Sequence, residues 1–199
     1  MAARPIAMRP SCSSPPRTMS RPFLRYLKVD KVDIFGFSNG ASVALQVAIR
    51  HPQLVRKMVF ASSITKRAGA QPQLWEFMKQ ADFSNMPQQL KDAFLLVNPD
   101  VQQLKTMHDK DAARMQSFKD VPDDAVRSVR APPLIALGDQ DIVKPEHAVE
   151  LTRLISDARL LILPGAHGDY LGEAVLTQKQ TRYPELPARL IEQFLDSEL

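Results

Sequence analysis

Residues 36–40 read Gly-Phe-Ser-Asn-Gly, a G-x-S-x-G pattern with Ser38 at its centre. A serine in such a pattern can act as the nucleophile of acyl-transfer chemistry when it stands on a sharp turn from a strand into a helix. Small residues are needed two positions away, because the strained serine backbone brings its neighbours close. The alternative is that Ser38 only caps a helix beginning near Asn39. An apolar run before the pattern and a helical pattern after it favour the nucleophile.

A serine hydroxyl becomes an effective nucleophile only when a neighbouring base takes its proton. The chain has four histidines that could serve. His51 ends a helical stretch beside a proline, His108 lies in a helical region, and His147 falls in the first turn of a helix. His167 instead follows an apolar run, in a loop expected at the carboxyl edge of a parallel sheet, where sites of such sheets gather. We therefore predict His167 as the base.

A carboxylate should accept a hydrogen bond from this base, which fixes its tautomer and stabilises the imidazolium. Residues 138–141 read Gly-Asp-Gln-Asp and follow another apolar run. Both Asp139 and Asp141 are candidates, and spacing alone does not decide between them. The chain order of serine, aspartate and histidine is the one expected when the serine stands on this kind of turn.

Four short apolar runs predict the strands that would position these side chains. They cover residues 32–37, 57–62, 133–138 and 159–163. Helical patterns occupy residues 41–50, 146–156 and 185–197, and the first stops before Pro52 because a residue ahead of proline disfavours the helical conformation. Buried strands separated by amphipathic helices predict an α/β fold, with a parallel sheet and helices on both faces.

Residues 66–130 interrupt this alternation. They hold helical patterns at 73–81, 87–96, 101–118 and 122–129 and no convincing strand. We predict a helical insertion between the second and third strands, so that residues 23–65 and 131–199 form the α/β core. The methionines of the insertion, interpreted as core filler in the first instance, are Met78, Met86, Met107 and Met115.

Residues 1–22 have a different composition from the rest. They contain five prolines and four arginines and little apolar periodicity, so we predict a disordered or artefactual tail. The six basic residues up to Lys28 account for the net charge of +4, since the remainder carries 20 basic and 22 acidic residues. A basic excess confined to such an arm is not typical of a nucleic-acid-binding domain, and we expect no nucleic-acid partner.

Membranes, disulfides and cofactors are not indicated by the sequence. No apolar stretch approaches the roughly 18 residues of a membrane-spanning helix, so we expect no membrane partner. Cys12 is the single cysteine, which fits a reducing compartment and predicts a cytoplasmic protein. We see neither a metal-ligand cluster nor a loop that would cradle phosphate, and expect no cofactor or metal.

Taken together, segments 36–40, 138–145 and 164–167 resemble the α/β-hydrolase superfamily, over about residues 23–199. The resemblance implies that Asp141, the second aspartate of its turn, is the acid rather than Asp139. It also implies that the inserted helices 66–130 form a lid that covers the site and shapes an acyl or alcohol pocket. Serine at position 38 is similar to the esterase, lipase and peptidase members, whereas haloalkane dehalogenases and epoxide hydrolases have aspartate there.

The sequence departs from this family in front of the nucleophile. Family members have several strands and a helix there, with a loop, often His-Gly, that supplies one oxyanion-hole N–H. Only 37 residues precede Ser38 and none form a His-Gly pair, so we expect an N-terminally truncated form of the fold. The N–H of Asn39 is the expected oxyanion donor, and a second has no visible source. Strand 32–37 should become an apolar edge, which predicts self-association of the chain into a homo-oligomer.

The expected activity is that of a serine esterase, which hydrolyses a small-molecule carboxylic ester through an acyl-enzyme. Ser38, His167 and Asp141 would be nucleophile, base and acid. Two alternatives remain. The chain could be a catalytically impaired fragment that acts as a binding or pseudo-enzyme domain. The same three residues could also serve an amide or carbon–carbon hydrolase, an acyltransferase or a perhydrolase.

Overall fold

The computed structural model describes Tyr26, residues 28–173 and residues 185–198. The chain divides into two units, Met1–Asp30 and Lys31–Leu199. Of the first unit only Tyr26, which is helical, and residues 28–30 are described. The predicted tail at 1–22 therefore lies outside the described residues. All helices and strands named below belong to the second unit.

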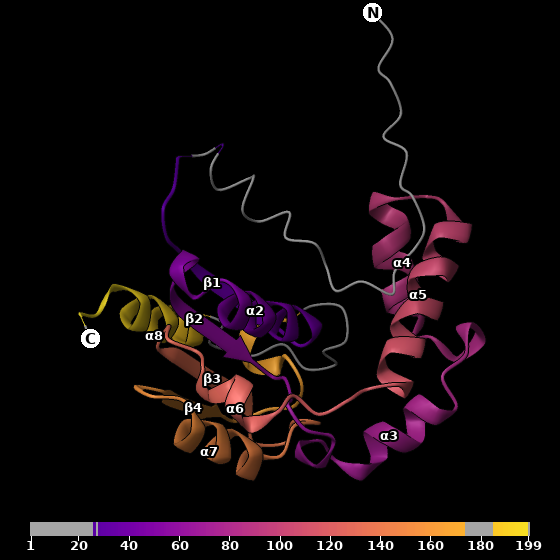
Figure 1. The fold of residues 1–199 in the computed structure, drawn as a ribbon. Coiled ribbons are helices and arrows are strands. Elements are labelled where there is room, and N and C mark those ends of the chain that lie inside the picture. The colour runs from indigo at the N-terminus through magenta and orange to yellow at the C-terminus, as the bar shows by residue number, and fades with distance from the viewer. Residues whose placement is uncertain (1–25, 27, 174–184, 199) are drawn as a thin grey trace, which may run out of the picture. The chain divides into compact units, whose positions relative to one another are not determined.

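A parallel sheet of four strands, in the order β1-β2-β3-β4, lies at the centre of the second unit (Figure 1). The strands are β1 (Val32–Phe37), β2 (Val55–Ala61), β3 (Pro133–Gly138) and β4 (Arg159–Leu163). Three of them begin and end at the predicted residues, and β2 lies up to two residues earlier than expected. Because all pairings are parallel, the carboxyl ends of the strands share one edge of the sheet.

Helices cover both faces of this sheet, which confirms the predicted fold class. On one face, Met58 and Phe60 of β2 share a buried cluster with α2 (Asn39–Arg50) and α7 (Pro145–Leu154). On the other face, their neighbours in the strand belong to a second cluster that includes Phe194 of α8 (Glu185–Asp196). Burial on both faces explains why the strands are continuously apolar rather than alternating.

The edge of the sheet is formed by β1. Among the described residues this strand pairs only with β2, and the side chain of Phe35 is 51% exposed. The predicted self-association through this edge stays a prediction. In the part of the chain that the structure describes, no helix is both long and apolar enough to cross a membrane.

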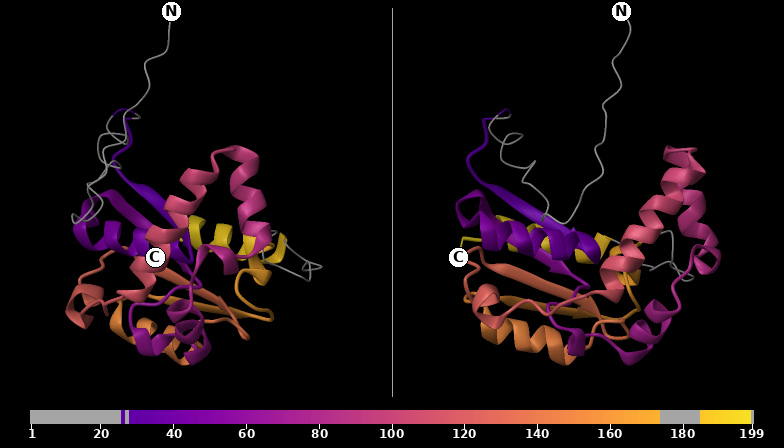
Figure 2. Two further views of the ribbon diagram at one scale, coloured as in Figure 1. Left: turned by 90° about the vertical axis from the view of Figure 1, so that its right-hand side faces the viewer. Right: turned by 45° about the vertical axis from the view of Figure 1, so that its right-hand side comes forward.

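Four helices follow β2 and precede β3, close to the predicted positions. They are α3 (Pro72–Lys79), α4 (Gln88–Val97), α5 (Val101–Gln116) and α6 (Asp123–Arg127). The short helix α6 packs on the core through Val126, which is fully buried. In Figure 2, α4 and α5 stand next to each other beyond the carboxyl edge of the sheet. We call residues 66–130 the inserted segment.

The chain leaves the core before α3 and returns to it after α5 at the same place. The backbone N–H of Val121 donates a hydrogen bond to the carbonyl oxygen of Thr65 at 2.8 Å. The N–H of Thr65 in turn donates to Nε2 of His147 at 3.1 Å. The fully enclosed ring of His147 lies against Gly69, where a Cβ atom would overlap it. The entry to the segment is therefore fixed onto α7.

Burial lowers the pKa of His147, although the hydrogen bond to Glu150 opposes this effect. Because Nε2 accepts a hydrogen bond from Thr65, the ring carries its proton on Nδ1, which donates to Glu150 Oε2 at 3.2 Å. The neutral form of His147 is thus the one that the packing requires.

Candidate active site

Ser38 stands on a strained turn between β1 and α2. Its backbone has φ 52° and ψ −118°, a region that residues with a Cβ rarely adopt. Its N–H donates to the carbonyl oxygen of Ala61 at 2.8 Å, which holds the turn against β2. The hydroxyl makes no capping hydrogen bond to α2. The alternative role of Ser38 as a simple helix cap is therefore not supported.

Of the two glycines that flank Ser38, only Gly36 lies where a larger residue would not fit. A Cβ at Gly36 would lie 2.5 Å from both Cα of Ala41 and the carbonyl oxygen of Gly40. Backbone atoms cannot move aside easily, so position 36 needs glycine. At Gly40 a Cβ would meet no atom within 4 Å. The expectation that both neighbours must be small thus holds for the first glycine only.

His167 bridges the other two predicted residues. Its Nε2 lies 3.1 Å from Oγ of Ser38, and its Nδ1 lies 2.8 Å from Oδ1 of Asp141. A carboxylate only accepts, so Nδ1 carries the proton and Nε2 is free to accept from the Ser38 hydroxyl. The ring of Phe37 packs against the imidazole, with 4.9 Å between ring centroids. The structure thus brings together three side chains that lie up to 129 positions apart in the chain.

Asp141 is buried and fully hydrogen-bonded. Burial by itself would raise the pKa of Asp141, but the hydrogen bonds from His167, Ser62 and Val143 outweigh it and hold the pKa below its usual value. The carboxyl group is therefore ionised at neutral pH. Asp139 makes no hydrogen bond to His167, and its carboxylate accepts instead from the backbone N–H of Gly165, in the loop that carries His167. Of the two aspartates that spacing left open, Asp141 is the one within hydrogen-bond distance of the His167 ring.

The turn at residues 138–141 and the loop at residues 164–168 pack directly on each other. The N–H of Asp139 donates to the carbonyl oxygen of Leu163, and the N–H of Gln140 donates to that of Gly165. A Cβ at Gly138 would overlap the carbonyl oxygen of Gly165. A glycine at the end of β3 therefore allows the close approach that joins Asp141 to His167.

Asn39 begins α2 beside the nucleophile. The N–H groups in the first turn of a helix have no partner within the helix, and that of Asn39 has no other acceptor in the described part of the chain. The dipole of the helix favours negative charge at this position. Its placement suits the predicted role of oxyanion donor. Among the described residues we find no second donor.

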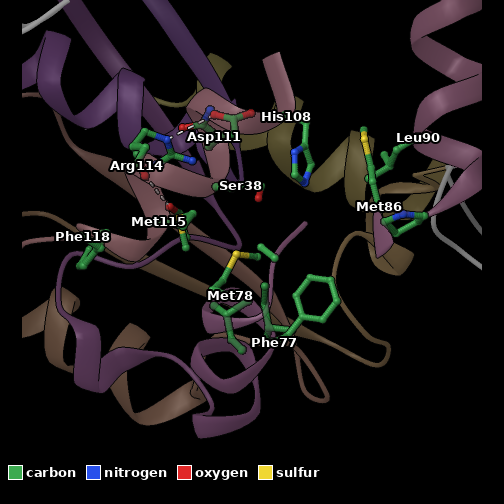
Figure 3. Close-up of a pocket in the computed structure, with 18 of the residues that line it drawn as sticks. Ser38, Phe77, Met78, Met86, Leu90, His108, Asp111, Arg114, Met115 and Phe118 are labelled. Atoms are coloured by element: carbon green, nitrogen blue, oxygen red, sulfur yellow. Dashed lines mark hydrogen bonds and ion pairs between the residues drawn. The ribbon is translucent and has the colours of Figure 1, made fainter. Parts of the chain in front are cut away.

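A cavity of about 500 Å³ opens in front of Ser38, between the sheet edge and the inserted segment. Figure 3 shows Phe77, Met78 and His108 pointing into it around the serine. All four methionines of the inserted segment line this cavity. Met115 also packs against the hydrophobic core, as the core-filler interpretation expects, so for this residue the two roles coincide. Flexible thioether side chains form a wall that can adapt to differently shaped apolar groups.

Three polar residues of α5 also line the cavity and were missed by sequence reasoning. They are His108, Asp111 and Arg114, spaced three apart and hence on one face of the helix. Asp111 accepts a hydrogen bond from Arg114 Nε at 3.4 Å. Nothing in the sequence separates such a row from an ordinary solvated helix face. In the described part of the chain, no group of three or more His, Cys, Asp or Glu side chains could hold a metal ion.

A family model of the alpha/beta hydrolase fold matches residues 19–133, more than half of the chain. The chain belongs to the alpha/beta hydrolase fold family. The matched part of this hydrolase-fold chain contains the turn at Ser38, whereas Asp141 and His167 follow it in the sequence. The family resemblance inferred from three short segments is confirmed.

Solved structures of hydrolases share the fold. The enol-lactonase from Burkholderia xenovorans LB400 has a TM-score of 0.61 and 16% identity, over 88% of this chain and 69% of that chain. A putative lipase from Acinetobacter baumannii AYE has a TM-score of 0.58 and 22% identity, over 88% and 63%. The meta-cleavage product hydrolase from Pseudomonas fluorescens IP01 has a TM-score of 0.53 and 18% identity, over 86% and 68%.

These identities support a shared alpha/beta hydrolase fold and nothing finer. The chain spans 63% to 69% of the length of the three solved structures. No curated protein matches it. The substrate has to be argued from the cavity and from the side chains around Ser38.

Proposed function

We propose that the protein is a serine hydrolase that cleaves carboxylic esters through an acyl-enzyme, with Ser38, His167 and Asp141 as its catalytic residues. The proposal depends above all on one observation, the imidazole of His167 within hydrogen-bond distance of both Ser38 and Asp141. The strained backbone at Ser38 adds support, because such outliers gather at active sites. Membership of the hydrolase family supports the class of reaction.

In the first half-reaction, Nε2 of His167 takes the proton of the Ser38 hydroxyl as its oxygen attacks the ester carbonyl. Asp141 stabilises the resulting imidazolium by accepting from its Nδ1–H. The negative charge on the carbonyl oxygen is stabilised by the N–H of Asn39. His167 then gives its proton to the departing alcohol, and the acyl group stays bonded to Ser38.

In the second half-reaction, His167 takes a proton from a water molecule, which attacks the acyl carbon. The tetrahedral intermediate collapses, His167 returns the proton to the Ser38 oxygen, and the carboxylic acid leaves. Removing one oxyanion donor typically lowers the rate about 10²–10³-fold, so a site with only the Asn39 donor should be slow.

The acyl group belongs in the apolar cavity, and helices α3, α4 and α5 act as its lid. The methionine and phenylalanine side chains that line this cavity suit a hydrocarbon chain. Each buried CH₂ group contributes about 0.8 kcal/mol, which corresponds to roughly a fourfold gain in kcat/KM per group. We therefore expect kcat/KM to rise from acetate to octanoate esters. The single cysteine supports a cytoplasmic location.

The test compares the parent with Ser38→Ala on p-nitrophenyl esters, and measures labelling by a fluorophosphonate probe. We expect hydrolysis and labelling at Ser38 in the parent and neither in the variant. Ser128→Ala is the matched control, because its exposed hydroxyl only donates to Ala125 at the end of α6.

Equal hydrolysis by Ser38→Ala and the parent would refute the proposal. A folded parent that neither hydrolyses esters nor reacts with the probe would favour the binding or pseudo-enzyme role. Labelling at Ser38 without ester hydrolysis would point to one of the other reactions, and a panel of amides and of diketones with cleavable carbon–carbon bonds would then identify it.

A further inference from the structure

Ser62 holds an unusual backbone conformation directly beyond the end of β2. Its φ is 50°, in the left-handed region that favours glycine, yet the residue is a serine and is 97% buried. Its N–H donates to the carbonyl oxygen of Ala136 at 2.8 Å, so the strained position is fixed against β3. A strained residue that is not glycine suggests that its side chain has a function.

The hydroxyl of Ser62 donates to Oδ2 of Asp141 at 2.5 Å. The two oxygens of this carboxylate therefore have different partners, since Oδ1 accepts from His167 and from the N–H of Val143. The other neighbour of Oδ2 in the described part of the chain is the N–H of Gly138, at 3.5 Å. Ser62 is thus the main group that holds the far side of the carboxylate.

Tyr170 continues this chain of hydrogen bonds. Its hydroxyl lies 2.9 Å from Oγ of Ser62 and 3.2 Å from the carbonyl oxygen of Ala136. Because the proton of Ser62 is committed to Asp141 and a carbonyl oxygen only accepts, the single proton of the Tyr170 hydroxyl is shared between Oγ of Ser62 and the carbonyl oxygen of Ala136, with Ser62 the nearer of the two. Burial, aided by the charge on Asp141, raises the pKa of Tyr170 well above its usual value despite the opposing hydrogen bond to Ser62. Tyr170 therefore keeps the proton that it donates.

We propose that Ser62 is a positioning residue for the catalytic acid, and that Tyr170 orients the Ser62 hydroxyl for this task. The Ser62 hydroxyl fixes the rotation of the Asp141 carboxylate so that Oδ1 faces Nδ1 of His167. The proposal rests on the proposed function for its kinetic consequences, but not for the geometry that it predicts. If Ser62 only satisfied a buried carboxylate, its loss would change stability and leave the rate per folded molecule unaltered.

Two substitutions at Ser62 separate these roles. Ser62→Gly and Ser62→Ala both remove the hydroxyl, but only glycine relieves the left-handed strain, so the glycine variant should melt at the higher temperature of the two. Loss of a hydrogen bond to a charged group that is needed for catalysis should lower the rate roughly ten- to a hundredfold. We expect kcat per folded molecule to fall by that factor in both variants, with KM little changed, and by less in Tyr170→Phe.

The pH dependence gives a second kinetic readout. A carboxylate that has lost a donor attracts the imidazolium more strongly, so the acid limb of the kcat/KM profile should move to higher pH in both Ser62 variants. Ser128→Ala should leave both rate and profile unchanged. A rate per folded molecule equal to that of the parent in Ser62→Gly would overturn the proposal, as would a larger loss in Tyr170→Phe than in Ser62→Gly.

A readout without substrate distinguishes failure of this inference from failure of the proposed function. The hydrogen-bonded Nδ1 proton of His167 should give a downfield proton NMR signal that disappears in His167→Gln. We expect this signal to shift or broaden in Ser62→Gly and to persist in Ser128→Ala. An unchanged signal in Ser62→Gly refutes positioning whether or not the parent hydrolyses esters. If the signal changes in Ser62→Gly although the parent hydrolyses no ester, only the proposed function is refuted.

Discussion

Oδ1 of Asp139 accepts a hydrogen bond from the backbone N–H of Gly165 at 2.9 Å. This contact ties the turn that carries Asp139 and Asp141 to the loop that carries His167. Asp141, two residues further along, contacts the imidazole of His167 itself. Two neighbouring aspartates of one turn therefore have separate tasks, and substitution can distinguish them.

Asp141→Asn should lower kcat for ester hydrolysis by about 10⁴-fold, the loss found when the triad aspartate of a serine protease is replaced in this way. The amide can donate to Nδ1 and so favours the wrong tautomer of His167. Asp139→Asn keeps an oxygen for the Gly165 N–H and should retain most of the activity. Steady-state kinetics on p-nitrophenyl butyrate measure both, and similar losses in the two variants would contradict the assignment of the acid.

Gly36→Ala should destabilise the fold and abolish labelling of Ser38. Its Cβ would collide with backbone atoms of Gly40 and Ala41 that define the nucleophile turn. Gly40→Ala is the matched control, since that Cβ reaches no atom within 4 Å. Thermal melts and fluorophosphonate labelling test the pair. A Gly40→Ala variant as damaged as Gly36→Ala would show that the turn tolerates neither substitution.

Leu90→Trp should shorten the preferred acyl chain. Leu90 of α4 lines the cavity, and an indole there takes up space that a longer chain would occupy. We expect kcat/KM for the octanoate ester to fall about tenfold while the acetate ester is little affected. Leu96→Trp changes the same helix at a side chain that is 88% exposed and outside the cavity, and should alter neither. Equal losses on both esters in Leu90→Trp would argue against this placement of the acyl group.

The stability of the fold should depend on pH through His147. Because burial lowers its folded-state pKa, the unfolded chain binds more protons than the folded one below the usual imidazole pKa of roughly 6.5. The free energy of unfolding should therefore decrease as pH falls below that value, and stop decreasing below the lowered folded-state pKa.

Urea unfolding at pH 7.5 and at pH 5.5 measures this difference. In His147→Gln the loss between the two pH values should be smaller, since the amide oxygen can accept from Thr65 without titrating. His51→Gln is the control, because that ring has no hydrogen bond among the described residues. The prediction fails if His147→Gln loses as much stability on acidification as the parent.

Most of the parallel sheet could be predicted from local sequence patterns. The strands β1, β3 and β4 were predictable to the residue, because strands buried on both faces are continuous apolar runs with clear ends. Ser38 was predicted because it directly follows such a run, and His167 because its loop follows another. The choice of Asp141 needed the family resemblance, since the direction of two nearby carboxylates depends on loop packing that spacing does not encode.

The residues that surround the three candidate catalytic side chains could not be predicted from the sequence. Ser62 follows β2 like many serines that end strands, and its left-handed backbone and its contact with Asp141 appear only once β3 lies alongside. Tyr170 and the polar row of α5, from His108 to Arg114, likewise acquire their neighbours from distant parts of the chain. Tertiary contacts of this kind leave no periodic signal.

The hydrogen bond from Val121 to Thr65 joins the residues just before α3 and just after α5 at one point of the core. Closing a loop becomes only slowly more costly in entropy as residues are added to it. Evolution can therefore lengthen, shorten or exchange the intervening helices without rebuilding the sheet. Under the function proposed above, substrate range and bond-breaking chemistry would reside in separate parts of the chain, and grafting these helices from another hydrolase onto the two anchor residues would test that division.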